Sequence, residues 1–221
     1  MFKKILLFIL LTYFLSTKIT QAQEYIGHYA LGVQGGVNLP LGSSIITQLP
    51  EKMGPAIGFN FKYFPNNGFA MGVNYRHLQS DITTSTKAYT VPVSHTILSI
   101  SLEHYFNPEG QLRPFIGLEL GISVNNFDPP VEFKNQQFVP NPYSSYLIAP
   151  KLGVMYQLNN SWSIAAEATL HNLFDPGDTS FWKATDGTTF APVKRSVTGT
   201  IGIIYHFRPM NLPKGEGVHK H

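Results

Sequence analysis

The residues best placed to support chemistry lie in one short segment, from His171 to Gly177. A histidine acts as the general base of an acyl transfer when a hydroxyl nucleophile lies within hydrogen-bond reach. The neighbours of His171 in this segment supply no such hydroxyl, and a histidine capping the Pro176-Gly177 turn is the simpler interpretation. The chain contains no cysteine, which excludes a thiol nucleophile, a disulfide framework and a Cys-ligated metal site. We therefore expect a protein that is not an enzyme.

Metal, cofactor and nucleic-acid sites are not predicted either. The eight histidines form no His-x-His pair within a strand and no His-Glu-x-x-His sequence, and no Gly-rich phosphate loop opens a helix. His219 and His221 lie at the very end of the chain, where we expect a tail. Without residues 1–22, the chain carries 13 basic and 13 acidic side chains, so no basic stripe remains for nucleic acid.

The two ends of the chain are predicted to lie outside the folded domain. Lys3 and Lys4 precede an apolar run of about 11 residues that is followed by a small residue, Ala22. This order is typical of a cleaved signal peptide, and the run is shorter than the roughly 20 residues that a transmembrane helix needs. We expect a signal peptide over residues 1–22, one domain over 23–207 and a flexible periplasmic tail over 208–221.

The domain consists of segments in which apolar residues alternate with small or polar ones. Alternation with a period of two predicts β-strands with one apolar face. Strands of about 9 to 13 residues suit a tilted crossing of a roughly 30 Å hydrocarbon layer. The eight predicted strands span residues 29–39, 56–64, 69–78, 94–106, 114–124, 146–158, 162–171 and 196–207.

The connections between these segments alternate in length. Residues 65–68, 107–113 and 159–161 form short turns, whereas residues 40–55, 79–93, 125–145 and 172–195 form long loops. This asymmetry predicts an all-β, eight-stranded antiparallel up-and-down transmembrane β-barrel with short periplasmic turns and long extracellular loops. Aromatic residues near the short turns predict a periplasmic girdle. Its members are Tyr63, Phe69, Phe106, Tyr156, Trp162, Tyr205 and Phe207.

Charged side chains occur on the small, Gly-rich face of the strands. A soluble barrel places its apolar face inside, whereas a membrane barrel places it outside. The charges therefore predict a lumen, in which opposite charges form ion pairs. A proton or ion path and a polar plug both fit, and we favour the plug because eight strands leave no open channel. The predicted lumenal network is Lys62, Arg76, Glu103, Glu119, Lys151 and Glu167.

The predicted signal peptide, the eight alternating strands and the terminal Tyr205-x-Phe207 resemble small outer-membrane β-barrel families: OmpA-like, OmpX-like and the PorT-like barrels of Bacteroidota. The resemblance implies the cell outer membrane of a Gram-negative organism as location. It also implies outer-membrane lipid and the barrel-assembly machinery as partners. This chain departs from the pattern, because 14 residues follow Phe207. His171 to Gly177 faintly resembles the lipid A deacylase family, with Leu173 where that family has its nucleophilic serine.

The long loops carry aromatic residues, which often mark contact surfaces when exposed. The leading hypothesis is a non-enzymatic outer-membrane barrel that acts through these loops. The alternatives are a subunit of an envelope or secretion complex, a lipid A-modifying enzyme and a narrow pore. The candidate contact residues are Phe127, Phe133, Phe138, Tyr143, Phe181, Trp182 and Phe190.

Overall fold

The chain forms an antiparallel β-barrel. The computed structural model describes residues 27–41, 51–83, 90–127, 142–174, 182–183, 189–190 and 194–207. No helix in these ranges is long and apolar enough to cross a membrane. The predicted signal peptide (1–22) and tail (208–221) lie outside the described residues. The long strands are β1 His28–Pro40, β3 Gly54–Asn66, β4 Phe69–Thr83, β5 Thr90–Tyr105, β6 Leu112–Phe127, β7 Tyr143–Gln157, β8 Trp162–Phe174 and β11 Arg195–Phe207.

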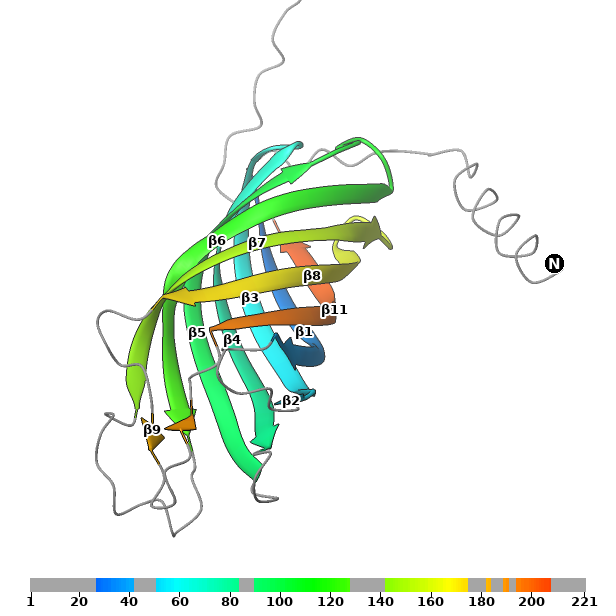
Figure 1. Cartoon of the computed structure of the whole chain (residues 1–221). Coiled ribbons are helices and arrows are strands. Elements are labelled where there is room, and N and C mark those ends of the chain that lie inside the picture. The colour runs from blue at the N-terminus through cyan, green and yellow to red at the C-terminus, as the bar shows by residue number, and fades with distance from the viewer. Residues whose placement is uncertain are drawn as a thin grey trace, which may run out of the picture.

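These eight strands close on themselves. Each pairs with the next along the chain, and β11 returns to pair with β1, from Tyr29 opposite Phe207 to Pro40 opposite Ser196. Figure 1 shows the resulting closed wall. The short β2 (Glu51–Lys52) extends the edge of β4, while β9 (Trp182–Lys183) pairs with β10 (Thr189–Phe190). The prediction of an eight-stranded antiparallel barrel is confirmed.

The strands run further at the long-connection end than the alternation predicted. Residues 79–83 continue β4, and β5 begins at Thr90. Residues 125–127 continue β6, and β7 begins at Tyr143. The predicted loops 79–93 and 125–145 are wrong in these parts. Polar side chains such as Gln79, Ser80, Asn125 and Asn126 occur on both faces there, so the alternation fades although the backbone pairing continues.

Asparagine shapes two of the short turns. The Asn159 side-chain Oδ1 accepts hydrogen bonds from the backbone N–H of Ser161 (2.9 Å) and of Trp162 (3.0 Å). Asn107 has φ 54°, a left-handed conformation that asparagine tolerates better than most residues. Its side-chain amide donates to the carbonyl of Leu112 at 3.2 Å. Local side-chain chemistry therefore explains why these turns are tight.

Pro150 interrupts the β7–β8 pairing without inserting a bulge. The register is the same on both sides, with Ile148 opposite Asn172 and Lys151 opposite Thr169. A register shift occurs instead in the β3–β4 pairing, between Tyr63 and Asn66. Proline lacks an N–H, so the Leu170 carbonyl opposite it loses its ladder donor. The Asn172 side-chain amide lies 3.2 Å from the Ile148 carbonyl and 3.5 Å from that of Leu170.

Removing this substitute donor should destabilise the barrel. Asn172→Ala is expected to lower the free energy of unfolding by about 1–3 kcal/mol, because it leaves the Leu170 carbonyl without a donor in an apolar surface. Urea titration of the protein folded in lipid vesicles measures the effect. Pro150→Ala restores a backbone N–H, so Asn172→Ala should cost much less in that background. If Asn172→Ala lowers the free energy of unfolding equally in both backgrounds, then the Asn172 amide does not replace the N–H that Pro150 lacks.

Candidate functional site

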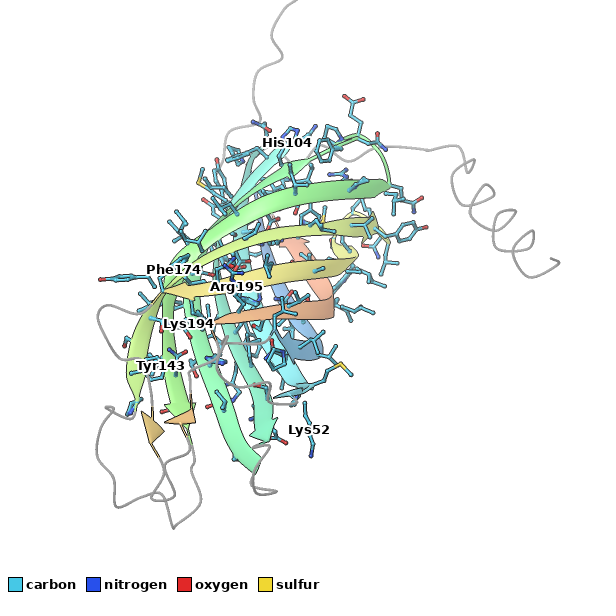
Figure 2. All side chains as sticks on the ribbon, in the orientation of Figure 1. Lys52, His104, Tyr143, Phe174, Lys194 and Arg195 are labelled. Atoms are coloured by element: carbon cyan, nitrogen blue, oxygen red, sulfur yellow. The ribbon has the colours of Figure 1, made fainter. Side chains whose placement is uncertain are left out.

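The barrel is apolar outside and polar inside. Large apolar side chains lie exposed along the outer face of the strands, as in Ile201, which is 67% exposed, and Leu152, which is 62% exposed. The buried side chains inside include Arg76 and Lys151. Figure 2 shows the side chains on both faces of the wall. A protein in water has the opposite arrangement, so this outer surface suits a lipid solvent.

All six charged residues predicted for the lumen meet in one network. Lys62 Nζ lies 2.8 Å from Glu103 Oε2, and Lys151 Nζ lies 2.5 Å from Glu103 Oε1. Lys151 also contacts Glu119 Oε1 at 2.9 Å.

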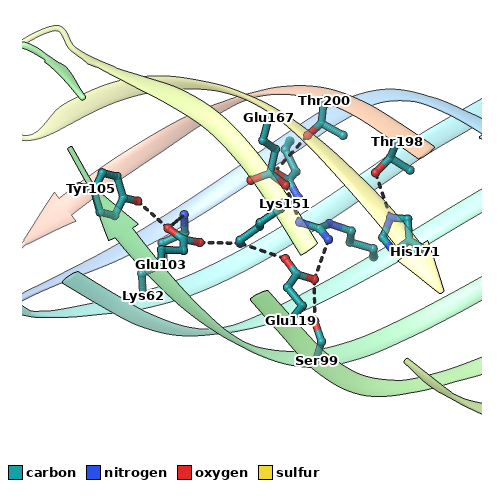
Figure 3. A network of polar contacts seen from close by, with 12 residues as sticks. Lys62, Ser99, Glu103, Tyr105, Glu119, Lys151, Glu167, His171, Thr198 and Thr200 are labelled. Atoms are coloured by element: carbon teal, nitrogen blue, oxygen red, sulfur yellow. Dashed lines mark hydrogen bonds and ion pairs between the residues drawn. The ribbon is translucent and has the colours of Figure 1, made fainter. Parts of the chain in front are cut away.

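Arg76 continues this network across the lumen. Its Nη1 lies 2.7 Å from Glu119 Oε2, and its Nη2 lies 2.5 Å from Glu167 Oε1. The order is therefore Lys62, Glu103, Lys151, Glu119, Arg76 and Glu167, which alternates in sign and is neutral as a whole (Figure 3). Residues on β3, β4, β5, β6, β7 and β8 are joined by this one charge chain, as we call these six residues.

Neutral polar groups complete the contacts of the charge chain. The Tyr105 hydroxyl donates to Glu103 Oε2 at 2.6 Å, and the Ser99 hydroxyl donates to Glu119 Oε2 at 3.0 Å. With its amide oriented to pair donors with acceptors, Gln34 accepts from Arg76 Nε at 3.0 Å and donates to Glu167 Oε1 at 3.3 Å. None of these three was predicted. Tyr105 follows Glu103 by two residues on one strand, so the period-two rule could have found it.

Clusters of buried apolar side chains lie on both sides of the charge chain. Along β7, the buried inward residues include Met155, then Lys151, then Ala149 and Leu147, in order from the short-turn end. The apolar cluster at the short-turn end consists of Ala30, Phe64, Ala70, Tyr105, Phe115, Met155 and Ile204. The cluster at the other end consists of Ala56, Leu78, Ile97, Leu147, Ala149 and Leu173.

Two buried cations, Lys62 of the charge chain and Arg113, lie close to the short-turn cluster. Lys62 Nζ lies 5.5 Å from the centre of the Phe115 ring, a cation–π contact. Arg113, which was predicted as part of a turn, is buried, and its Nε donates to the Gly110 carbonyl at 2.8 Å. Its Nη2 also contacts Gln157 Oε1 at 3.2 Å.

His171 also lies in the lumen and is fully buried. Its Nε2 lies 2.9 Å from Thr198 Oγ1, a hydroxyl that β11 supplies from 27 residues away in sequence. The segment from His171 to Gly177 gives no sign of this hydroxyl, because it lies on another strand. Thr198 is itself 1% exposed, so neither group is accessible to a substrate from outside the barrel. Within the described residues, no group of three or more His, Asp or Glu side chains is placed to hold a metal ion.

The predicted aromatic girdle contains a continuous set of ring contacts near the short turns. Trp162 contacts Tyr205, with ring centres 4.9 Å apart, and Tyr205 contacts Phe207 at 6.1 Å. Tyr29, which was not predicted, joins Phe207 (5.9 Å) to Tyr63 (5.0 Å). Phe106 makes an edge contact with His104, whereas the described ring contacts do not include Phe69 or Tyr156.

Most of the predicted contact aromatics cannot be placed. Phe133, Phe138 and Phe181 lie outside the described residues. Three more have only their backbone described: Phe127 ends β6, Trp182 belongs to β9 and Phe190 to β10. Tyr143 is 8% exposed on the inner face at the start of β7, so it is not the exposed loop residue that was predicted.

The closed wall, the apolar exterior and the charged interior together define the fold of the small outer-membrane β-barrels. No family model matches the sequence, and no curated protein matches it. Among solved structures, the Neisserial surface protein A (NspA) aligns over 82% of this chain and 97% of its own, with a TM-score of 0.55 and 15% identity. The outer membrane protein OprG from Pseudomonas aeruginosa aligns over 86% and 100%, with the same TM-score and identity. The resemblance to PorT-like barrels stays a prediction.

Proposed function

We propose that this chain is a non-enzymatic integral protein of the outer membrane that acts at its long-connection end and has a closed lumen. The observation that carries the proposal is the inside-out distribution of polarity: an apolar outer face around a neutral, buried charge chain. A lipid layer solvates such a surface, and a closed barrel leaves no unpaired backbone edge in that layer. The short turns would then lie in the periplasm, and the long connections outside the cell.

Epitope insertion tests this orientation. An epitope placed within residues 128–141 should be detected by antibody on intact cells. The same epitope placed between Asn67 and Gly68, in a short turn, should be detected only after the cells are permeabilised. Fractionation of both strains checks that the protein reaches the outer membrane. Detection of the short-turn epitope on intact cells would overturn the orientation.

The closed lumen predicts an absence of ion conduction. The buried ion pairs and the apolar clusters on either side of them support this prediction, because they oppose a continuous path for water. In planar bilayers, the purified protein should give no stepwise conductance above that of protein-free bilayers. Regular steps that change with Glu119→Ala would support the narrow-pore alternative instead.

The buried position of His171 supports the non-enzymatic proposal. In the lipid A-modifying alternative this histidine would activate a nucleophile, and its loss would abolish the modification. We expect cells carrying His171→Ala to have the lipid A profile of cells carrying the parent protein. The lipid A profile of cells lacking the whole gene is the reference for complete loss of function. A profile that changes in the same way in both strains would assign a lipid-modifying activity.

The proposed partners follow from the surfaces. The apolar outer face would contact outer-membrane lipid, and β11, which ends at Phe207, would be the strand that the barrel-assembly machinery recognises.

A role as a subunit of an envelope complex predicts that other proteins remain bound to the chain after extraction in mild detergent. Mass spectrometry of the extracted particle identifies them. A particle containing only this chain and detergent would favour a free-standing barrel.

A further inference from the structure

The outer surface of β4, β5 and β6 changes from apolar to polar over two steps along the strands toward the long-connection end. Tyr75, Leu98 and Ile122 lie side by side in register and are exposed on the outer face. Two residues further toward the long-connection end, a distance of about 7 Å, this face carries His77, Thr96 and Val124. The next outward row contains Gln79, Ser94 and Asn126. The wall therefore continues beyond its apolar belt with side chains that form hydrogen bonds.

A groove of about 270 Å³ lies in this polar part of the wall. It is slightly smaller than the pockets of about 300–1,000 Å³ that hold drug-sized ligands. Its size suits a single polar ring. The groove is lined by Gln79, Ser80, Asp81, Pro92, Val93, Ser94 and Asn126.

The groove offers hydrogen-bonding groups that the protein itself does not use. Within the described part of the chain, no hydrogen bond or ion pair engages the side chains of Asp81, Ser94 or Asn126. Among the described residues, the Gln79 side-chain amide contacts only His77, with its nitrogen 3.2 Å from His77 Nε2. The groove therefore presents a carboxylate, a hydroxyl and amides to a ligand. A sugar ring suits this set, because its hydroxyls donate to a carboxylate and accept from an amide.

The charge of the groove and its position on the barrel restrict the class of ligand further. The described lining of the groove includes the carboxylate of Asp81 and no cation, so it favours a neutral headgroup over a phosphate. The apolar row of Tyr75, Leu98 and Ile122 lies below the groove on the same face. A lipid whose acyl chains cover that row would hold its headgroup at the height of the groove.

We propose that this groove binds the sugar headgroup of a glycolipid in the outer leaflet. The inference rests on the proposed outer-membrane location, since it requires lipid on this face of the wall. The sugar supplies the hydroxyl groups for Gln79, Asp81 and Asn126. The acyl chains lie against the apolar row beneath.

Native mass spectrometry of the full chain, folded in detergent, tests the proposal. The probes are monoglucosyldiacylglycerol, the matching diacylglycerol without a sugar, and phosphatidylglycerol with the same acyl chains. We expect retained adducts of the glucosyl lipid at concentrations where the other two give none. The double variant Gln79→Ala with Asp81→Ala should bind it about tenfold more weakly, since it loses two hydrogen-bonding groups. Asn126→Ala should weaken binding about threefold.

Matched controls separate this site from general lipid binding. Asn160→Ala removes an exposed amide from a short turn at the opposite end of the barrel and should leave binding unchanged. Free methyl glucoside at millimolar concentration should not displace the lipid, whereas displacement would assign the groove to soluble sugars and overturn the lipid source. Equal binding of phosphatidylglycerol, or equal binding by the double variant and Asn160→Ala, would overturn the proposal. Membrane fractionation of the same variants tests the outer-membrane location separately.

Discussion

Replacing Arg76 with methionine is expected to lower the free energy of unfolding by about 3–5 kcal/mol, the cost typical of breaking a buried ion pair from one side. Arg76 is 1% exposed and pairs with both Glu119 and Glu167. Glu119 keeps Lys151 as a partner when the guanidinium is removed. Among the described residues, the hydrogen bond from Gln34 is the contact that Glu167 keeps. The expected cost therefore comes mainly from one carboxylate left buried without a counter-charge.

The double variant Arg76→Met with Glu167→Gln tests this explanation. It removes the stranded charge, so it should recover at least half of the lost stability, because buried pairs replaced by neutral groups cost little. Lys52→Met serves as a control, since Lys52 is an exposed cation and should change the stability by less than about 0.5 kcal/mol. Urea titration in lipid vesicles measures all three variants. A loss below about 1 kcal/mol for Arg76→Met would show that the charge chain contributes little to stability.

The architecture could be predicted from the sequence because the barrel wall has two chemically different faces. Apolar residues such as Ile57, Phe59 and Phe61 alternate with Gly58, Asn60 and Lys62 through the lipid-facing part of β3. Such alternation predicts where the strand lies and which face of the wall each side chain occupies. The predicted strand ends were wrong where the wall extends beyond the apolar belt, as at Gln79 and Ser80, because both faces are polar there. Backbone pairing, which leaves no periodic signal of its own, extends the strands in that part.

The candidate site was predictable as a set of residues but not as a set of contacts. A charged side chain on the small face of a strand must point into the lumen, which identified all six members of the charge chain. Which partners meet depends on the register of strands far apart in sequence, as with Arg76 and Glu167, which are 91 residues apart. The same limit concealed Thr198 beside His171. Turn lengths restrict the register of neighbouring strands, but contacts across the lumen follow only from the closed barrel.

The second large effect on stability is expected where β1 and β11 close the barrel. Two adjacent glycines of β1, Gly35 and Gly36, allow it to be tested. Gly36 faces Thr200 of β11 in the pairing that closes the wall. A Cβ atom at Gly36 would collide with the backbone carbonyl of Gly199, whereas a Cβ atom at Gly35 would meet only the Ala56 carbonyl, at 4.0 Å. We expect Gly36→Ala to lower the free energy of unfolding by about 3 kcal/mol, because a backbone atom cannot move aside as a side chain does.

The neighbouring substitutions should have the opposite sign. Gly35→Ala and Gly199→Ala place a methyl group in open or nearly open space. Neither glycine has a positive φ, so alanine fits the backbone and should raise stability by about 0.4–1 kcal/mol through the unfolded chain. The yield of folded barrel after refolding into vesicles and the urea midpoint measure both effects. If Gly35→Ala and Gly36→Ala destabilise the barrel equally, then glycine is needed throughout β1 for its flexibility. If only Gly36→Ala does so, close approach of β1 to β11 is what requires glycine where the wall closes.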